Sequence, residues 1–153
     1  MKRIICTIFI IVFVLSFAAC SSREAISAAE FTSRMADAGH TVVDHSHYFE
    51  DDPNSGLSTH LIADCGTFEV EFLLFGTAER AREVHTNIRH ELETASGVRS
   101  ARSEVNTSNF NRFRQTSEGE FGVVSRIGNT IVVVVTSSDY QAEVDTVLDI
   151  LGY

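Results

Sequence analysis

The sequence predicts an α+β domain, with one antiparallel sheet of about five to six strands and three helices packed chiefly on one face. Three segments have the periodicity of amphipathic helices, and the segments between them alternate with the period of two that is typical of strands. Short turns separate successive strands, which favours antiparallel pairing. The order helix, strands, helix, strands, helix is typical of a layered α+β fold.

The three helices are predicted from their start and stop signals. Each segment begins at a residue that can cap a helix and ends at a glycine, which favours the left-handed conformation of a helix end: Ser27 to Gly39, Thr77 to Gly97 and Ser138 to Gly152. Ser27 and Glu30 have the spacing of a capping box, and the third helix repeats this spacing with Gln141. Tyr153, the last residue, is expected to fold back onto Leu148.

The strands are predicted from short apolar runs between turn residues. They fall at residues 41–44, 58–63, 67–75, 110–116, 120–127 and 130–136. No element is predicted for residues 98–109. In the run 67–75, Glu69 and Glu71 lie two residues apart and therefore on one face, which we expect to be the solvated outer face.

The clearest strand signal is a hairpin around Gly128 and Asn129. A two-residue turn with glycine in the first central place sets Ile127 opposite Thr130. The same register sets Val123 opposite Val134. Because residues 131–135 are apolar on both faces, the last strand is predicted to be central in the sheet.

The N-terminal segment has the features of an export signal. Residues 4–19, IICTIFIIVFVLSFAA, carry no charge and follow Lys2 and Arg3. These 16 residues would form a helix of about 24 Å, which is shorter than the roughly 30 Å hydrocarbon core of a membrane. The segment is therefore expected to be removed after export.

Two cleavage positions fit the end of this segment. Ser16 and Ala18 satisfy ordinary signal peptidase, which would leave Ala19 as the new N-terminus. Alternatively, cleavage before Cys20 is expected, because residues 15–20, LSFAAC, resemble the lipobox of bacterial lipoproteins. The resemblance implies that Cys20 is diacylated and anchors the protein on the extracytoplasmic side of the cell membrane. The expected organisation is then a signal peptide (1–19), a lipidated cysteine with a short tether (20–26) and one globular domain (27–153).

A second resemblance concerns the end of the chain. The stretches VVSRIGNTIVVVV and YQAEVDTVLDILGY resemble the C-terminus of small lipoproteins of Gram-positive bacteria. That family offers no catalytic residues to carry over to this sequence.

The charge of the mature chain excludes nucleic acid as a partner. Once Lys2 and Arg3 are removed, ten basic residues, all arginine, face 21 acidic ones, a net charge of −11. Such a balance repels phosphates and anionic headgroups. Arginines gather in the second half, where Arg112 and Arg114 share one strand face and could grip an anion bidentately, or could form an ordinary solvated face.

A histidine-rich segment offers the alternative of a metal site. If the chain is extended there, His45 and His47 point the same way, and with Asp44 and His60 they could hold zinc. The competing interpretation is a solvated acidic loop that ends in a turn.

The remaining reactive residue types give no catalytic site. Cys65 would be the only thiol of the mature part once Cys20 is acylated, and it is expected to be a small buried hydrophobe on the side opposite His60. His85 and His90, five residues apart on the second helix, are expected at the surface. No serine elbow and no glycine-rich phosphate loop occurs, so neither an enzyme nor a cofactor is predicted.

These observations predict a membrane-anchored extracytoplasmic lipoprotein. Its domain would act as a small binding or accessory module at the cell envelope, with an envelope protein or a small ligand as partner. The alternative is a zinc-type metal-binding protein that uses the segment 40–60.

Overall fold

The structure is a computed structural model of the chain, and it describes residues 23–49, 55–95 and 100–153. The predicted signal segment with Cys20 lies outside the described residues, as do Glu50, Asp51 and Asp52 of the acidic segment. Within the described part, no helix is both long and apolar enough to span a membrane.

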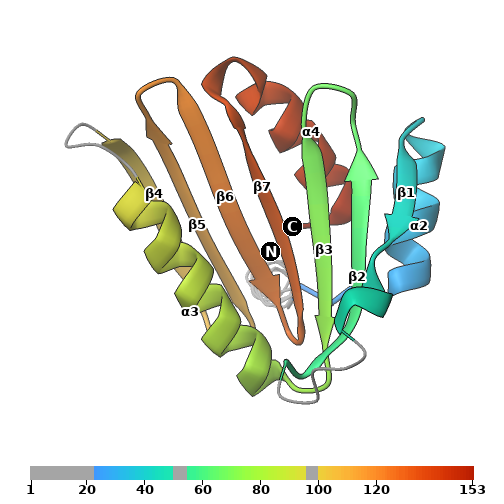
Figure 1. Ribbon diagram of the computed structural model, residues 1–153. Helices are drawn as coiled ribbons and strands as arrows, with labels where there is room; N and C mark the ends of the chain where they lie inside the picture. Colours follow the sequence, from blue (N-terminus) through green and yellow to red (C-terminus); the bar gives the residue numbers. More distant parts are fainter. Residues whose placement is uncertain (1–22, 50–54, 96–99) are drawn as a thin grey trace, which may run out of the picture.

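The strands form one open antiparallel sheet of seven, in the order β1-β2-β3-β7-β6-β5-β4 (Figure 1). Their bounds are β1 Thr41–Asp44, β2 Leu57–Asp64, β3 Glu69–Phe75, β4 Ser100–Asn106, β5 Phe110–Ser117, β6 Glu120–Ile127 and β7 Thr130–Ser137. The predicted antiparallel α+β fold is confirmed. The strand count exceeds the expected five to six because β4 comes from the segment 98–109, for which no element was predicted.

In the described part of the chain, three helices cover the sheet from both sides. They are α2 (Ala28–Asp37), α3 (Ala78–Ala95) and α4 (Gln141–Leu151), and two short 3-10 turns, η1 (Ser46–Phe49) and η2 (Ser138–Tyr140), accompany them. The two terminal helices, α2 and α4, pack together on one face, while α3 crosses the face turned toward the viewer in Figure 1. The expected arrangement, chiefly on one face, therefore holds for two of the three helices.

The central strand β7 explains why helices are needed on both faces. Val132 and Val134 point toward α2 and α4, whereas Ile131 and Val133 belong to the cluster under α3. All four side chains are buried. Strand residues alternate between faces, so an all-apolar strand requires cover on each side.

The predicted hairpin between β6 and β7 is confirmed in register. Ile127 pairs with Thr130 and Val123 with Val134. Gly128 has φ 56°, a left-handed conformation that glycine adopts without steric cost, and this fixes a two-residue turn.

The helix ends that the structure describes follow the predicted signals with one correction. Gly97, the predicted stop of the second helix, lies outside the described residues. In α2, the Ser27 amide donates to Glu30 Oε2 (2.8 Å) and the Glu30 amide donates to Ser27 Oγ (3.2 Å), which is the expected capping box. The second box, Ser138 with Gln141, is wrong. Residues 138–140 instead form the turn η2, and Ser137 caps this turn by accepting a hydrogen bond from the Asp139 amide. The helix α4 starts at Gln141 without a side-chain cap.

The folded domain begins within the segment that was expected to be a tether. Ile26 is buried in the main core, and the Arg23 carbonyl accepts a hydrogen bond of 2.7 Å from Asn109 Nδ2. Arg23 Nη1 also donates to the Gly152 carbonyl (3.3 Å). Residues 23–26, which the sequence assigns to the tether, therefore pack onto the domain.

Tyr153 closes the C-terminal end of the main core. Gly152 is left-handed, with φ 84°, and the Tyr153 amide donates to the Leu148 carbonyl (2.9 Å), as the helix-end signal predicted. The ring is buried, and its hydroxyl hydrogen-bonds to Thr130 Oγ1 on β7. The last residue thus joins α4 to the central strand.

Replacing Tyr153 tests this closure. We expect Tyr153→Ala to lower the free energy of unfolding by about 3–5 kcal/mol, because a large buried ring leaves a cavity. Tyr153→Phe keeps the ring and loses only the hydrogen bond, so the loss should be about 1 kcal/mol. Urea denaturation of both variants measures the two values, and equal losses would contradict the role given to the ring.

Candidate functional site

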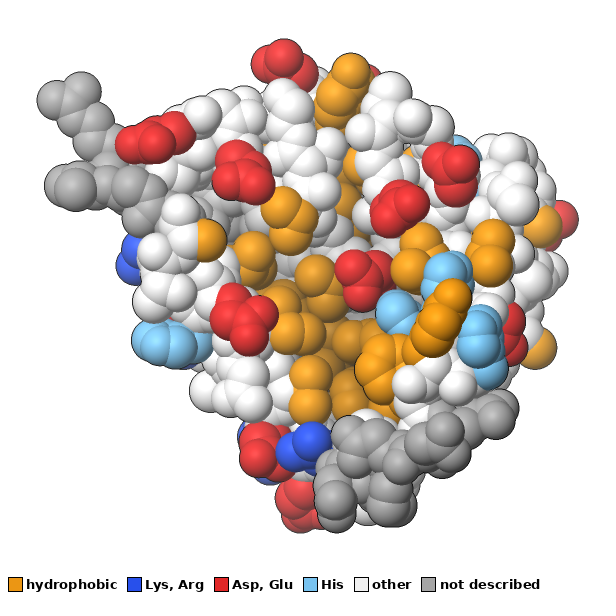
Figure 2. All heavy atoms as spheres, viewed as in Figure 1, with side chains coloured by type: hydrophobic (Ala, Val, Ile, Leu, Met, Phe, Trp, Pro, Cys, Tyr) orange, Lys and Arg blue, Asp and Glu red, His pale blue; other side chains and the backbone are white. Residues whose placement is uncertain are grey.

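Among the described residues, no α-helix covers the part of the sheet face that lies beside α3. On this side α3 packs mainly on β3, β5, β6 and β7, and Leu57 at the start of β2 packs against the cluster beneath it. Figure 2 shows hydrophobic side chains gathered in a hollow at the centre of this face, with acidic side chains around it. We call this surface the open face and define it by Val43, Ile62, Glu71, Leu73 and Val135.

Two valines of the open face are unusually exposed for strand residues. Val43 on β1 is 49% exposed and Val135 on β7 is 48% exposed. The register places Ile62, Glu71 and Val133 side by side across β2, β3 and β7, between these two valines. Ile62 is partly exposed and Val133 is buried, so the apolar surface is most exposed at its two ends. Exposed apolar side chains gathered on one face are typical of an interaction site.

The turn η1 and the rings of Tyr48, Phe49 and His60 form the rim of the open face next to β1. Tyr48 is 70% exposed, and Phe49 lies edge-on to the His60 ring with the ring centroids 5.4 Å apart. His60 Nε2 lies 3.3 Å from Glu71 Oε2. His60 is nearly buried while Glu71 is half-exposed, so the pair places a carboxylate in the middle of an apolar surface.

The chain turns at the segment for which the alternative of a metal site assumed an extended conformation. Asp44 Oδ1 accepts a hydrogen bond of 2.8 Å from the Ser46 amide at the start of the turn η1, and interactions with the Ser46 hydroxyl and then with this amide lower the pKa of Asp44. The chain is therefore not extended at His45 and His47, and His60 is engaged by Glu71. Within residues 23–49, 55–95 and 100–153, no group of three His, Cys, Asp or Glu residues could hold a metal ion.

A depression of about 220 Å³ extends the open face under the C-terminal half of α3. It lies between that helix and the strands β6 and β7, and its lining includes Glu91, Leu92, Ala95, Glu120, Gly122 and Val135. A Cβ at Gly122 would lie 2.8 Å from Leu92 Cδ2, so the absence of a side chain there lets α3 approach the sheet. Its two glutamates continue the acidic border of the open face.

The predicted arginine pair lies on the other side of the sheet. Arg112 and Arg114 share the face that carries α4, as their spacing predicted, but they differ in their partners. Arg114 forms an ion pair with Asp145 of α4, and its guanidinium lies 5.3 Å from the centre of the Phe121 ring. Arg114 is therefore already paired within the protein.

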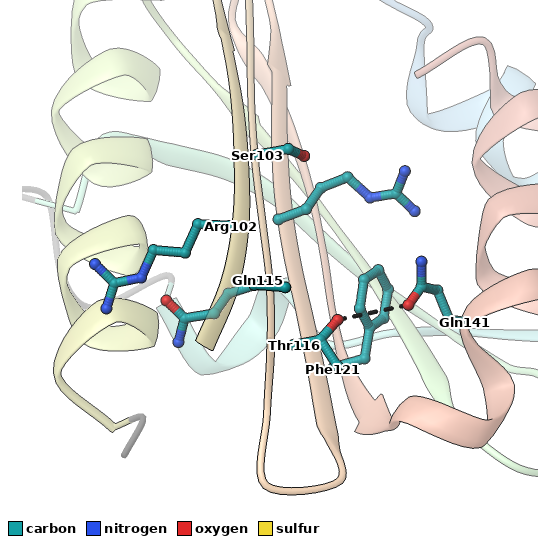
Figure 3. A pocket seen from close by; sticks show the side chains of 8 residues that line it. Arg102, Ser103, Gln115, Thr116, Phe121 and Gln141 are labelled. Atoms are coloured by element: carbon teal, nitrogen blue, oxygen red, sulfur yellow. Dashed lines mark hydrogen bonds between the residues drawn. The ribbon is translucent and has the colours of Figure 1, made fainter. Parts of the chain in front are cut away.

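A shallow pocket of about 170 Å³ adjoins Arg114 (Figure 3). Ser103, Thr116 and Gln141 are among the residues that line it, and Figure 3 labels them. Thr116 Oγ1 donates to Gln141 Oε1 at 3.5 Å. The polar groups of this pocket come from the edge strand β4, from its neighbour β5 and from the start of α4.

Two buried polar side chains under α3 were missed at the sequence level. His85 is only 4% exposed, although it was expected at the surface. Arg126 is fully buried and donates to Asn111 Oδ1 (2.7 Å) and to the carbonyls of Gly128 (2.6 Å) and Ser108 (3.2 Å). Ala81, Val84, His85 and Ile88 follow the spacing of one helix face, which could have revealed the burial of His85.

Cys65 has the properties of a structural thiol. Burial, with a smaller contribution from Asp64, raises its pKa to about 11, so the thiolate is scarce at neutral pH. Cys65 packs against the core beneath α2, whereas His60 points to the opposite face of the sheet. Cys65 and His60 therefore do not form a catalytic pair.

Comparisons with known proteins add no family to this picture. No protein-family model matches the chain, and no curated protein matches its sequence. A GTP-binding regulator from Thermotoga maritima is similar in structure, with a TM-score of 0.49 and 14% identity over 85% of this chain and 93% of that one. The extracellular domain of PknH from Mycobacterium tuberculosis has a TM-score of 0.37 and 12% identity over 83% of this chain and 92% of that one. At these scores neither likeness bears on function.

The burial of His85 predicts a pH dependence of stability. Desolvation, followed by the charge of Arg126, lowers its pKa from 6.5 to about 4. A hydrogen bond with the Val124 backbone and the charge of Glu104 oppose this shift, and Arg89 adds to it. The unfolded chain therefore takes up the proton first as the pH falls. The contribution of His85 is complete above pH 6.5 and is lost between pH 6.5 and pH 4, by roughly 2 kcal/mol at pH 5.

The His85→Gln variant isolates this effect because glutamine is polar, similar in size and does not titrate. We expect wild type to lose roughly 2 kcal/mol more than His85→Gln between pH 7.5 and pH 5 in urea denaturation. Other groups titrate equally in both proteins. Parallel stability curves would show that His85 can be protonated in the folded state.

Proposed function

We propose that this chain is a lipid-anchored extracytoplasmic protein whose open face binds a polypeptide segment of another envelope protein. The exposed apolar surface across β1, β2, β3 and β7 is the observation that carries the proposal. Large exposed apolar patches are uncommon on monomeric proteins and often mark a binding site.

The charge of this surface favours a basic and apolar partner. Glu71 lies within the open face, and Glu91 and Glu120 border the depression that continues it. The mature chain carries 21 acids against ten arginines, so the wider field also attracts cations. A segment with apolar side chains flanked by Lys or Arg would match both properties.

The anchor part of the proposal depends on the N-terminal sequence. An uncharged run of 16 residues after Lys2 and Arg3, followed by the lipobox-like LSFAAC, supports export and acylation of Cys20. Acylation would hold the domain at the extracytoplasmic membrane surface, where envelope proteins are present at high local concentration.

Replacing Cys20 tests the anchor. We expect wild type to fractionate with membranes and Cys20→Ser to appear in the soluble fraction, because the acceptor of the lipid is lost. Labelling with radioactive palmitate should give a signal only for wild type. If wild type is cleaved after Ala18 and takes up no label, the protein is secreted without an anchor.

Three valines of nearly equal exposure allow a matched test of the open face. Val43 and Val135 belong to it, whereas Val105, 49% exposed on β4, lies on the opposite side of the sheet. With a photocrosslinking side chain at position 135 in cells, we expect capture of a defined partner. Val43→Asp should reduce capture at least about fivefold, because a buried unpaired charge opposes docking.

The Val105→Asp variant is the control for this experiment. It adds the same charge at the same exposure and should leave capture unchanged. Equal loss with Val105→Asp, or undiminished capture with Val43→Asp, would show that the open face is not the docking surface.

A further inference from the structure

Arg112 presents the recognition edge of its guanidinium to the interior of the protein. Its Nε and Nη2, the two nitrogens that together bind a carboxylate as a fork, are buried and have no hydrogen-bond partner among the described residues. The side chain as a whole remains partly exposed. A buried arginine edge without acceptors is rare, since the desolvation of a charged donor is costly.

Ser125 supplies a second unsatisfied group at the same place. It pairs directly with Arg112 across β5 and β6, so the two side chains lie on the same face of the sheet. Ser125 is fully buried, and its Oγ also has no partner in the described part of the chain. Two neighbouring donors that lack acceptors indicate a site for an acceptor from outside the chain.

The surroundings of Arg112 leave a net positive charge. Burial lowers its pKa, the charges of Arg23 and Arg114 lower it further, and Asp145 and Asp149 of α4 oppose this. Arg114 forms an ion pair with Asp145. Of the charged groups named here, this leaves two cations, Arg23 and Arg112, and one anion, Asp149. Arg23 and Arg112 also share the Phe110 ring, with their guanidinium carbons 4.2 and 5.5 Å from its centre.

We propose that Arg112 and Ser125 form a binding site for a carboxylate group. The Nε and Nη2 fork of Arg112 would donate to the two carboxylate oxygens, and the Ser125 hydroxyl would donate a third bond. Arg114, which the sequence paired with Arg112, is not part of this site because Asp145 already occupies it. The site lies on the α4 side of the sheet and is therefore separate from the open face.

The enclosure of the Arg112 fork favours a small acid over a larger one. Nε and Nη2 are out of contact with solvent, and the Phe110 ring and the Arg114–Asp145 ion pair border the guanidinium. The partly exposed arginine side chain is long, so a rotation about its outer bonds admits a ligand. A free small carboxylic acid and the C-terminal carboxylate of a peptide share the required chemistry.

Titration with acetate tests the proposal directly. The full chain in micelles of a neutral detergent is titrated with sodium acetate in exchange for sodium chloride at constant ionic strength, while NMR follows the Arg112 Nε–H and Ser125 amide signals. We expect saturable shifts of both. Triglycine with a free or an amidated C-terminus forms a second arm, and binding of the free form alone would extend the site to peptide ends.

Four variants separate the fork from simple charge. Arg112→Lys keeps the charge but lacks the fork and should weaken acetate binding about tenfold or more, and Ser125→Ala should weaken it about tenfold. Asp149→Asn removes a competing anion and should tighten binding severalfold. Arg82→Gln, an exposed site on α3 across the sheet, removes one charge and should change nothing.

Several outcomes would overturn the site. Shifts that rise linearly without saturation, or equal affinity in Arg112→Lys and wild type, would show only nonspecific attraction of anions. A signal of Arg112 Nε–H that is protected from exchange yet indifferent to acetate would show that ordered water satisfies the fork.

Discussion

The burial of both faces of β7 is the constraint on which the architecture depends. Its residues from Thr130 to Val134 are buried, and they alternate between the cluster under α2 and α4 and the cluster under α3. An apolar strand of this kind cannot form the solvated face of a sheet, so cover on both sides is obligatory.

Two helices cover β7 on one side, where Tyr153, at the end of α4, hydrogen-bonds to Thr130. On the other side α3 is the only helix among the described elements, and it covers the half of the sheet that contains β5 and β6. The open face follows from this imbalance between seven strands and three helices.

The cover on the α3 side is also chemically different from that on the α4 side. Beneath α3 lie His85 and Arg126, and Arg126 satisfies its donors with an amide oxygen and two carbonyl oxygens instead of a carboxylate. This arrangement keeps the positive charge of Arg126 buried beneath α3, and that charge adds to desolvation in making protonation of His85 unfavourable. On the α4 side, Arg114 is neutralised by Asp145, whereas Arg112 has only the weaker influence of two aspartates. The arginine-rich half of the chain is thus divided between both faces of one pair of strands.

Much of the fold could be predicted from local sequence signals. The Gly128 turn fixed the register of β6 on β7 because one glycine conformation and a period of two leave a single alignment. The capping box at Ser27 and the left-handed end at Gly152 were equally local. The strand β4 escaped prediction because its sequence, SARSEVN, is mostly polar, with Ala101 and Val105 as its only apolar residues, as is common in edge strands. The side on which α3 packs depends on how strands distant in sequence are ordered, and no periodicity contains that information.

The candidate site was less predictable than the fold. Strand alternation predicts which residues share a face with Leu73 or with Ile62. Whether a helix covers that face depends on the path of the connection between β3 and β4. The spacing of Arg112 and Arg114 correctly placed both on one face. It could not distinguish an arginine that finds an aspartate on α4 from one that faces a buried serine, because both partners come from other segments. The conformation of the histidine segment could not be predicted either, since the hydrogen bond from the Ser46 amide to Asp44 turns a chain that the metal alternative required to be extended.

The early start of the folded body has a consequence for how the protein would stand on a membrane. Arg23 is fixed at both ends, by Asn109 in the turn between β4 and β5 and by Gly152 at the end of α4. Only Ser21 and Ser22 separate it from Cys20, so a lipid on that cysteine would leave a gap of about 10 Å at most. The domain would then have little freedom to tumble. It would rest on the end formed by these turns, with the α4 layer nearest its attachment and the uncovered half of the sheet turned to the side that approaching proteins can reach.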